Sequence, residues 1–321
     1  MTITRPSVRA VGVTQYGGPD VLRLLEVEAE PLGAEQVRVR VATATVNPTD
    51  TAVRAGLRGT GDRPAQGVDV PGMEIAGVLA EKGADVPADL RVGERVMGIV
   101  VQSGPHGGYR EDVVLPWRSV TRVPEGVSDA AAATLPMNGL TARQALDVLA
   151  LQPGQVLAVT GAAGAFGGYV IQLAKAEGLT VITDASEADE SLVRDLGADI
   201  VVRRGVDVAA RIREHFPEGV DGLADGAVLN VAVLPAVRDG GAVATIRFYK
   251  GDGQRGLRVK PVAVREYAEA VEKLDHLRDM AERGVLTLRV AETYPSEQAA
   301  DAHRRLEAGG TRGRLVLRFG E

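Results

Sequence analysis

The chain has 321 residues, which is enough for two domains with hydrophobic cores of their own. It contains no cysteine, and this excludes disulfides, thiolate chemistry and any metal site built on cysteine. The formal net charge of -6 argues against a nucleic-acid partner, which needs a basic surface. No segment approaches the apolar length of a membrane span, and the N-terminus lacks the apolar run of a signal peptide. We therefore expect a cytoplasmic enzyme that acts on a small molecule.

The first third of the chain has the pattern of short β-strands. Residues 8–14 are apolar and β-branched, and residues 36–41 alternate with period two, as in a strand with one buried face. Two further apolar runs, residues 74–79 and 94–101, are bounded by glycine. Many short strands separated by glycine and proline predict a barrel-like β domain.

From residue 124 onward, strands alternate with helices, and Ser128 has the position of a helix-capping residue. The predicted strands are residues 155–160, 180–183, 199–202 and 241–248, and the predicted helices are residues 139–150, 167–177, 209–216 and 265–283. This alternation predicts right-handed crossovers and a parallel sheet. A last strand is expected at residues 314–319.

Residues 159–168, VTGAAGAFGG, follow an apolar strand and open an apolar helix. A glycine-rich turn in that context is typical of a dinucleotide site. Gly164 lets the backbone approach a pyrophosphate, Gly167 lets helix and strand pack closely, and Ala162 stands where the general fingerprint has its first glycine. The alternative is an ordinary strand-to-helix turn. The predicted cofactor contacts here are Thr160, Ala163, Gly164, Ala165, Phe166 and Gly167.

The end of the second strand of this domain bears on the choice between NADH and NADPH. An acidic residue there would bind the ribose 2′-OH of NADH, but Ala185 and Ser186 stand near that position. Arg203 and Arg204 close the next strand and could bind a 2′-phosphate, or they could be a solvated loop. Asp184, with several acidic neighbours, opposes a phosphate. The sequence favours NADPH.

Several motifs together carry a family resemblance. They are residues 46–50 (VNPTD), 54–56 (RAG), 70–78 (VPGMEIAGV), 92–96 (VGERV), 107–111 (GGYRE), 135–142 (LPMNGLTA), the glycine-rich turn at 162–167 (AAGAFG), here called the cradle, 196–199 (LGAD) and 311–317 (TRGRLVL). With them the chain resembles, nearly end to end, the zinc-free quinone oxidoreductases, the zeta-crystallin-like branch of the medium-chain dehydrogenase/reductases.

The resemblance implies an α/β fold with a GroES-like β-barrel catalytic domain and a Rossmann domain with a doubly wound parallel sheet. The expected boundaries are residues 1–123 for the first part of the catalytic domain, 124–262 for the Rossmann domain and 263–321 for the return to the catalytic domain. It also implies a substrate cleft and a homodimer formed by pairing sheet edges, for which residues 241–246 are a candidate edge strand or an interior one.

The resemblance further implies NADPH-dependent hydride transfer, without a metal, to a quinone or another activated enone. At the positions where zinc-dependent relatives hold their metal, this chain has Asn47, Met73 and Pro136. The family often has a tyrosine two residues after Asp50, where this chain has Ala52.

Asn47, Asp50 and Tyr109 are the first candidates for the chemistry. Asn47 could donate its amide N–H to a substrate carbonyl or hold the cofactor ribose, or it could simply form a turn. Asp50 could orient a water or a hydroxyl, or cap a helix. Tyr109 could replace the missing tyrosine, or only pack. The other predicted cofactor contacts are Asn47, Thr141, Phe248 and Arg312.

Two alternatives stay open. Lys250 follows a late Rossmann strand and could donate a proton to an enolate carbon, as in the related enoyl reductase domains of polyketide synthases, or it could be an exposed loop lysine. The protein would then reduce a C=C bond of a carrier- or CoA-bound intermediate, with basic residues for a phosphopantetheine arm at Arg54, Arg58 and Arg63. The second alternative is a non-catalytic NADPH-binding sensor or structural protein.

Overall fold

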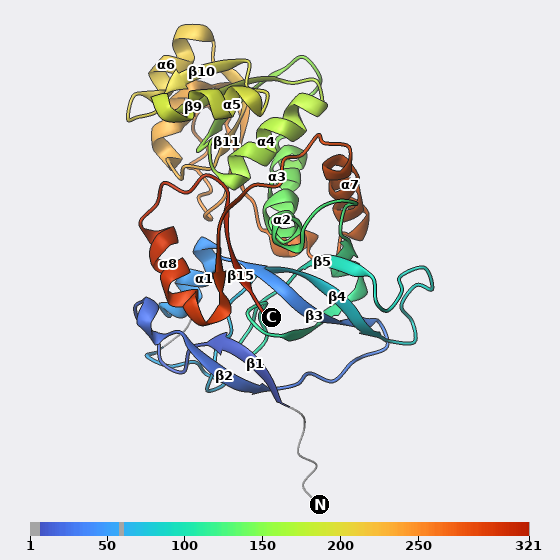
Figure 1. Cartoon of the computed structure of the whole chain (residues 1–321). Coiled ribbons are helices and arrows are strands. Elements are labelled where there is room, and N and C mark those ends of the chain that lie inside the picture. The colour runs from blue at the N-terminus through green and yellow to red at the C-terminus, as the bar shows by residue number, and fades with distance from the viewer. Residues whose placement is uncertain (1–6, 58–60, 321) are drawn as a thin grey trace, which may run out of the picture. The chain divides into compact units, whose positions relative to one another are not determined.

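The computed structural model describes residues 7–57 and 61–320, so Arg58 lies outside the described residues. The chain divides into two compact units, each of which is described by itself (Figure 1). Unit 1 comprises Met1–Met137, Ala268–Asp279 and Leu288–Glu321, and unit 2 comprises Asn138–Tyr267 and Met280–Thr287.

Unit 1 is built on a β-sheet that, within the described residues, has seven strands in the order β14-β15-β3-β4-β5-β7, with β6 paired to β3. The strands are β3 (Gln36–Thr45), β4 (Glu74–Lys82), β5 (Arg95–Ile99), β6 (Asp112–Pro116), β7 (Val120–Arg122), β14 (Val290–Pro295) and β15 (Arg314–Arg318). Val37, Val39 and Val41 of β3 are buried, which confirms the period-two prediction. A separate antiparallel pair joins β1 (Ser7–Gly12) to β2 (Arg23–Glu28).

The end of the chain, Leu288–Glu321, belongs to unit 1. Strand β15 pairs with β3 in antiparallel register, and the two lie side by side in Figure 1. The helices of this unit include α1 (Pro48–Arg54), α2 (Asp129–Ala132) and α8 (Ala299–Glu307), and α8 contacts α1, β14 and β15. The Ser128 hydroxyl accepts the N–H of Ala131, which confirms its capping role.

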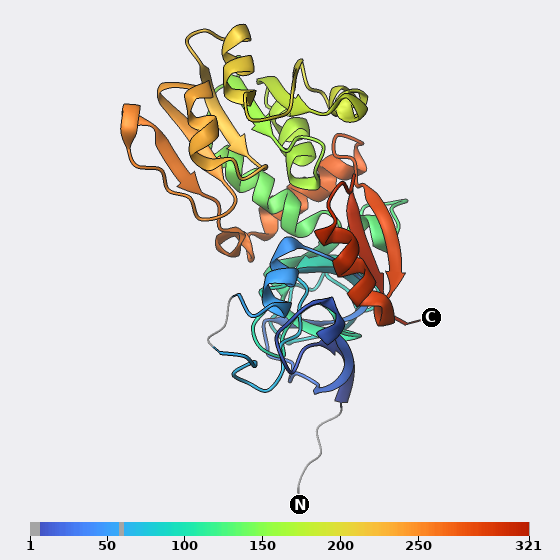
Figure 2. The same cartoon turned by 90° about the vertical axis from the view of Figure 1, so that its left-hand side faces the viewer.

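Unit 2 contains a six-stranded sheet of described residues in the order β10-β9-β8-β11-β12-β13, and every neighbouring pair is parallel. Numbered within the unit, the order is 3-2-1-4-5-6, that of a dinucleotide-binding Rossmann sheet. Figure 2 shows these strands side by side, from green through yellow to orange. The strands are β8 (Val156–Thr160), β9 (Thr180–Ala185), β10 (Ile200–Arg203), β11 (Val220–Asp225), β12 (Val237–Thr245) and β13 (Arg258–Pro261). The helices around it are α3 (Pro136–Leu149), α4 (Ala165–Ala176), α5 (Glu190–Asp195) and α6 (Val208–His215).

The structure decides one open alternative of the element prediction and corrects one predicted helix. Residues 241–246 belong to β12, which lies between β11 and β13 and is therefore interior; the edge strands of the sheet of described residues are β13 and β10. The helix expected over residues 265–283 is a short 3-10 turn, Val264–Tyr267, followed by α7 (Val271–Glu282). The interruption falls where the chain passes from unit 2 to unit 1, between Tyr267 and Ala268.

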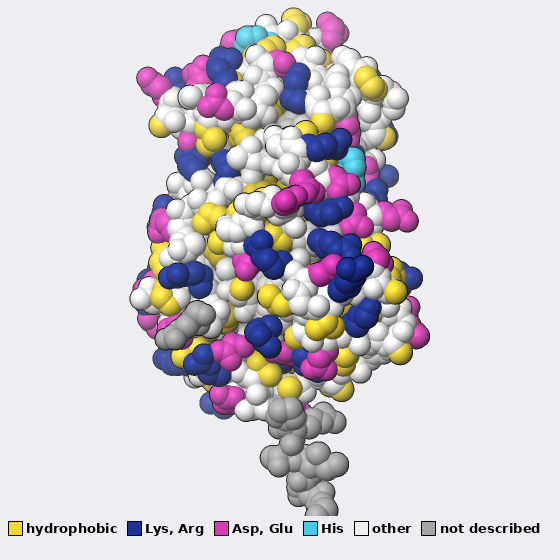
Figure 3. Space-filling view, turned by 45° about the vertical axis from the view of Figure 1, so that its right-hand side comes forward, with side chains coloured by type: hydrophobic (Ala, Val, Ile, Leu, Met, Phe, Trp, Pro, Cys, Tyr) yellow, Lys and Arg dark blue, Asp and Glu magenta, His cyan; other side chains and the backbone are white. Residues whose placement is uncertain are grey.

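The surface gives no sign of a single-sign charge field on the face that Figure 3 shows, where Lys and Arg side chains lie among Asp and Glu. Among the described residues, no helix is long and apolar enough to span a bilayer.

Candidate functional site

The glycine-rich turn of unit 2 joins the end of β8 to the start of α4. Gly161 has a φ of +66°, and the N–H of Gly164 donates to its carbonyl over 3.0 Å. Ala162 is buried and is not among the residues with positive φ. The left-handed conformation that favours glycine is therefore carried by Gly161, one residue earlier, and this explains why the fingerprint tolerates alanine at 162.

Gly167 closes the turn because it leaves no room for a side chain. A Cβ at this position would lie 2.5 Å from the carbonyl oxygen of Gly161 and 2.7 Å from Cα of Ala162. Helix α4 therefore packs directly against the end of β8, with its N-terminus at the turn. The positive end of the helix dipole at that place is suited to a pyrophosphate.

The parallel register of β9 and β10 brings four predicted cofactor residues to one edge of the sheet, Ala185, Ser186, Arg203 and Arg204. Arg203 pairs with Ala185, and the N–H of Arg204 donates to the Ala185 carbonyl over 2.9 Å. Both arginine side chains are exposed, and Arg203 makes only a 3.6 Å ion pair with the exposed Glu187. Ser186 is half-buried, and its hydroxyl donates to an Asp189 oxygen.

Asp184 lies in the same place but is turned toward the glycine-rich loop. It is 8% exposed, and its Oδ1 accepts the N–H of Gly161 over 2.8 Å and that of Ala162 over 3.5 Å. Burial raises the pKa of Asp184, while these N–H groups and the charge of Arg204 lower it. The sequence analysis treated Asp184 only as an opposing charge, whereas the structure shows that it anchors the turn.

Thr160 and Asp225 connect the carboxyl ends of β8 and β11. The buried Thr160 hydroxyl donates to Asp225 Oδ1 over 2.7 Å and accepts the N–H of Ala227 over 3.2 Å. Asp225 also accepts the N–H groups of Leu229 and Asn230. Thr160 therefore fixes the loop after β11 through its side chain, and Asp225 is a support that the sequence analysis missed.

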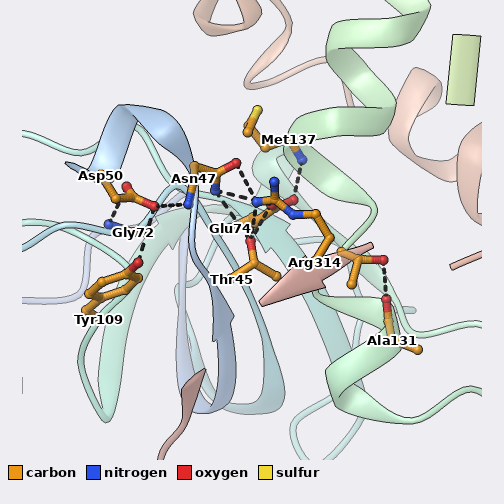
Figure 4. Close-up of polar contacts among 10 residues, drawn as sticks. Thr45, Asn47, Asp50, Gly72, Glu74, Tyr109, Ala131, Met137 and Arg314 are labelled. Atoms are coloured by element: carbon orange, nitrogen blue, oxygen red, sulfur yellow. Dashed lines mark hydrogen bonds and ion pairs between the residues drawn. The ribbon is translucent and has the colours of Figure 1, made fainter. Parts of the chain in front are cut away.

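Unit 1 contains a fully buried polar network at the ends of three strands (Figure 4). Glu74 Oε1 accepts from Arg314 Nη2 over 2.9 Å, from Asn47 Nδ2 over 3.3 Å and from the Thr45 hydroxyl. The other oxygen, Oε2, accepts the N–H of Met137 over 2.8 Å. Arg314 Nη2 also donates to Thr45 Oγ1 over 2.9 Å and to Asn47 Oδ1. Glu74 and Arg314 satisfy each other's charge in a place without solvent.

This network defines the surroundings of Asn47. Its amide oxygen faces Arg314, its nitrogen faces Glu74 and Thr45 at 3.3 and 3.4 Å, and the residue is 0% exposed. Donation to a substrate carbonyl would require the nitrogen to leave those two long contacts. In this structure the Asn47 amide nitrogen is therefore bound within the network, and it could contact a substrate only after it leaves Glu74 and Thr45.

The same neighbourhood does not fit a zinc ion. An amide, a thioether and a proline stand at Asn47, Met73 and Pro136, and a guanidinium reaches Asn47 from Arg314. These are not zinc donors, and among the described residues no group of three or more His, Asp or Glu side chains could hold a metal.

Asp50 forms a second buried cluster beside the first. Asn47 caps α1, and Asp50, the third helical residue rather than the cap, accepts the backbone N–H of Asn47 over 2.8 Å. It also accepts the N–H of Gly72 over 2.9 Å and the hydroxyl of Tyr109 over 3.4 Å. Burial raises the pKa of Asp50 from its ordinary 3.8 to about 6, although the two backbone donors and Arg314 lower it.

Tyr109 is fully buried and also contacts His303 of α8, with 3.2 Å between the hydroxyl and Nε2. Burial raises the pKa of Tyr109 well above 10. Burial, with a smaller effect of the charge of Arg54, lowers the pKa of His303 from 6.5 to about 3. Asn47, Asp50 and Tyr109 are thus brought together in unit 1, with His303 as a partner that no sequence motif indicated.

The remaining predicted residues have varied surroundings. Lys250 and Phe248 are exposed in the loop after β12, and Phe248 has a φ of +60°. Thr141 is half-buried in α3, and Arg312 is exposed just before β15. Arg54 is 4% exposed and pairs with Glu307 over 2.7 Å, so its burial contradicts a role at the mouth of a cleft, while Arg63 is exposed.

Glu74 and Arg314 did leave a signal in the sequence. Each is a charged residue that begins a run of apolar residues, EIAGVLA and RLVL, which become buried strands. A charge at such a place is expected to have a partner. The sequence does not say which partner.

Known proteins resemble the chain over nearly its whole length. Residues 33–125 match the family described as alcohol dehydrogenase GroES-like domain, and residues 196–317 match the one described as zinc-binding dehydrogenase. The chain is 31% identical to a 2-haloacrylate reductase of Burkholderia sp, over 97% of this chain and 98% of that protein. It is 30% identical to a quinone oxidoreductase of Pseudomonas aeruginosa, over 94% and 97%. A mycobacterial protein solved in complex with NADPH is similar with a TM-score of 0.82 and 26% identity, over 97% of this chain and 100% of that one.

Proposed function

Because the chain belongs to the medium-chain dehydrogenase/reductase superfamily, in its quinone oxidoreductase-like family, we propose that it transfers hydride from NADPH to a quinone or another activated enone without zinc. That it is an oxidoreductase that uses a nicotinamide cofactor follows from the family; the NADPH preference, the acceptor and the independence from zinc are the proposal. The observation that carries it is the buried network of Glu74, Arg314 and Asn47, which includes Asn47, one of the positions that the resemblance matches to the metal ligands of zinc-dependent relatives.

The residues of unit 2 fit a dinucleotide. Gly161 supplies the left-handed turn, Gly167 excludes a side chain beneath it, and the N-terminus of α4 offers the positive end of its dipole. The dinucleotide, when bound, supplies the hydride. The turn, anchored by Asp184, would hold the pyrophosphate against the end of the sheet.

Two features near the end of β9 act on the NADPH preference in opposite directions. Arg203 and Arg204 are exposed beside Ala185 and could form charge-assisted hydrogen bonds with a 2′-phosphate. Asp184 would repel that phosphate, but its carboxylate is turned to the N–H groups of Gly161 and Ala162. Two exposed cations stand against one anion whose carboxylate is already hydrogen-bonded, and this supports NADPH.

The proposed acceptor class is supported by the surroundings of Tyr109, the candidate that could replace the missing tyrosine of the family. Tyr109 is buried and bound to Asp50, and its pKa is raised, so it is a poor proton donor to a substrate. Quinones and other electron-poor acceptors need little help from an acid, because they accept hydride readily. The names of the two relatives, a quinone oxidoreductase and a 2-haloacrylate reductase, agree with an activated acceptor.

One observation keeps the enoyl reductase as a second candidate. Lys250 is exposed in the loop that follows β12, at the carboxyl edge of the sheet where Rossmann ligands bind. A lysine there could protonate the carbon that becomes an enolate after hydride addition. The third candidate, a sensor that binds NADPH without turnover, has no such support in the structure.

The test is a titration with NADPH and NADH by fluorescence, followed by NADPH oxidation with an ortho-quinone, an α,β-unsaturated ketone and an enoyl thioester. We expect tighter binding of NADPH and rapid turnover of the quinone, unchanged by a zinc chelator. Turnover of the thioester alone, lost in Lys250→Ala, would replace the proposal with the enoyl reductase. Binding without any turnover would favour the sensor.

We also propose a homodimer. The edge strand β13 has one side without a strand partner in the sheet of described residues, and pairing of two such edges would extend the sheet. Sedimentation equilibrium should give twice the chain mass of 33.6 kDa. A monomer at micromolar concentration would contradict this.

A further inference from the structure

Three buried polar side chains from distant parts of unit 1 form a continuous chain of contacts. Asp50 comes from α1, Tyr109 from the segment before β6, and His303 from α8. The Tyr109 hydroxyl lies 3.4 Å from Asp50 Oδ2 and 3.2 Å from His303 Nε2, and all three residues are 0% exposed. Figure 4 shows Tyr109 pointing at Asp50.

The direction of these hydrogen bonds follows from the chemistry of the three groups. An ionised Asp50 can only accept, so the Tyr109 hydroxyl donates its single proton to Asp50. The hydroxyl oxygen must then accept from His303, which places the ring proton on Nε2. His303 Nδ1 has no hydrogen-bond partner among the described residues, as expected of the unprotonated nitrogen of a neutral ring.

Asp50 connects this row of three side chains to the backbone of the network formed by Glu74, Arg314 and Asn47. Its two oxygens accept the N–H groups of Asn47 and Gly72, and Glu74 lies two residues after Gly72. Gly72 has a φ of +108°, and a Cβ there would lie 2.7 Å from Cδ1 of Tyr109. A displacement of Asp50 would therefore move the segments that carry both Asn47 and Glu74.

The charge on Asp50 depends on the donors around it. The groups that face it are the Tyr109 hydroxyl, the N–H groups of Asn47 and Gly72, and the charges of Arg314 and Glu74. Arg314 favours the carboxylate, while Glu74 and burial oppose it. If a protonated Asp50 donates from Oδ2 to Tyr109, both hydrogen bonds reverse and an N–H on His303 Nδ1 is left without a partner.

We propose that His303 and Tyr109 are positioning residues that act through Asp50, keeping it a carboxylate so that Asn47 and the segment from Gly72 to Glu74 stay in the arrangement that hydride transfer needs. The inference rests on the proposed reductase function. Neither residue touches the reacting atoms in this account, and their effect on the reaction passes through the two N–H groups that Asp50 binds.

The kinetic test compares the pH dependence of kcat/KM for quinone reduction in the wild type, Tyr109→Phe, His303→Leu and His303→Gln. In the wild type we expect activity to fall as pH drops through the titration of Asp50. Loss of the hydroxyl removes a donor from the carboxylate, so this acid limb should move up by about half to one pH unit in Tyr109→Phe. His303→Leu should behave similarly, and His303→Gln, which keeps an N–H near the position of Nε2, should restore most of the wild-type profile.

Tyr16→Phe is the matched control. It also removes a tyrosine–aspartate hydrogen bond of unit 1, that of Tyr16 to Asp69 at 2.7 Å, and should leave the pH profile unchanged. NADPH affinity, measured by fluorescence, should stay within about twofold in all variants, because the cradle lies in unit 2. Unshifted profiles in Tyr109→Phe and His303→Leu, with native NADPH affinity, would overturn the proposal.

A second measurement does not depend on activity. Long-range 15N–1H NMR of the full chain reports the tautomer of each histidine, and His303→Gln assigns the signal. We expect a neutral ring with its proton on Nε2 at pH 7 to 8, where Asp50 is a carboxylate. A His303 that titrates in this range, or that carries its proton on Nδ1, refutes the hydrogen-bond chain even if every acceptor is turned over. The expected tautomer without any turnover would instead refute the reductase function alone.

Discussion

Arg314 Nη2 lies 2.9 Å from Glu74 Oε1, although 240 residues separate the two in the chain. Each residue begins a strand, Arg314 in β15 and Glu74 in β4, and β3 lies between these strands in the sheet. Their side chains are 7% and 0% exposed, so neither charge is compensated by water. The pair therefore fixes the position of β15 in the seven-stranded sheet of unit 1.

Arg314→Met should be strongly destabilising, because it leaves the Glu74 carboxylate buried without its cation. Removal of one partner of a buried pair costs about 3–5 kcal/mol. Denaturant unfolding should show this loss, and Arg314→Met combined with Glu74→Gln should recover part of it. The control is Arg9→Met, which breaks the exposed pair with Glu111 and should leave the free energy of unfolding nearly unchanged. A similar small loss in both single variants would contradict the importance of the buried pair.

The Arg314–Glu74 pair also shows where sequence reasoning ends. The strand, turn and helix around residues 159–168 were predicted correctly because the three are adjacent in sequence and have different periodicities. The contact of Arg314 with Glu74 depends on the antiparallel pairing of β15 with β3, which no local pattern contains. For the same reason Asp50 and Tyr109 were named singly, and His303, an ordinary member of the α8 sequence, was not named.

Strand β11, which the sequence analysis did not predict, was missed for a related reason. Residues 220–225 of β11, VDGLAD, have a glycine and two aspartates in six residues, which weakens any strand signal. Asp225 ends the strand because its carboxylate accepts the N–H groups of the following loop and the hydroxyl of Thr160. Aspartate is disfavoured in strands, but at position 225 its carboxylate binds the neighbouring strand and the following loop.

Gly167→Ala should abolish dinucleotide binding. The added Cβ would lie 2.5 Å from the Gly161 carbonyl oxygen, a backbone atom that cannot move without displacing the turn. We expect NADPH affinity, measured by fluorescence, to fall at least about a hundredfold. The control is Gly18→Ala, since Gly18 has a φ of -68° and no atom near its would-be Cβ. Native affinity in Gly167→Ala would mean that the turn does not hold the pyrophosphate.

Loss of the arginine pair should shift the cofactor preference. A charge-assisted hydrogen bond contributes about 1.5–3 kcal/mol, so Arg203→Ala with Arg204→Ala should lower the ratio of kcat/KM for NADPH over NADH by tenfold or more. NADH values should change little. Arg238→Ala is the matched control, because Arg238 pairs with Asp221 near the amino ends of β12 and β11, away from the cradle edge. If the wild type instead prefers NADH and Asp184→Asn abolishes that preference, then Asp184 binds the ribose 2′-OH and the arginine pair does not select the cofactor.

Asp50 should make the protein less stable as pH rises between about 4 and 6. Its pKa is raised from 3.8 to about 6 by burial, so the folded protein binds this proton more tightly than the unfolded chain does. The stabilising effect is fully present below pH 4 and is lost as pH rises through 6, a change of about 3 kcal/mol at one pKa unit per 1.36 kcal/mol. Denaturant unfolding of the wild type and Asp50→Asn at several pH values isolates this contribution as the difference between the two slopes. Other carboxylates, such as Asp199 with its lowered pKa, act in the opposite sense in both proteins and cancel in that difference. Equal slopes would show that Asp50 is ionised throughout, held by the N–H groups of Asn47 and Gly72 more strongly than its burial suggests.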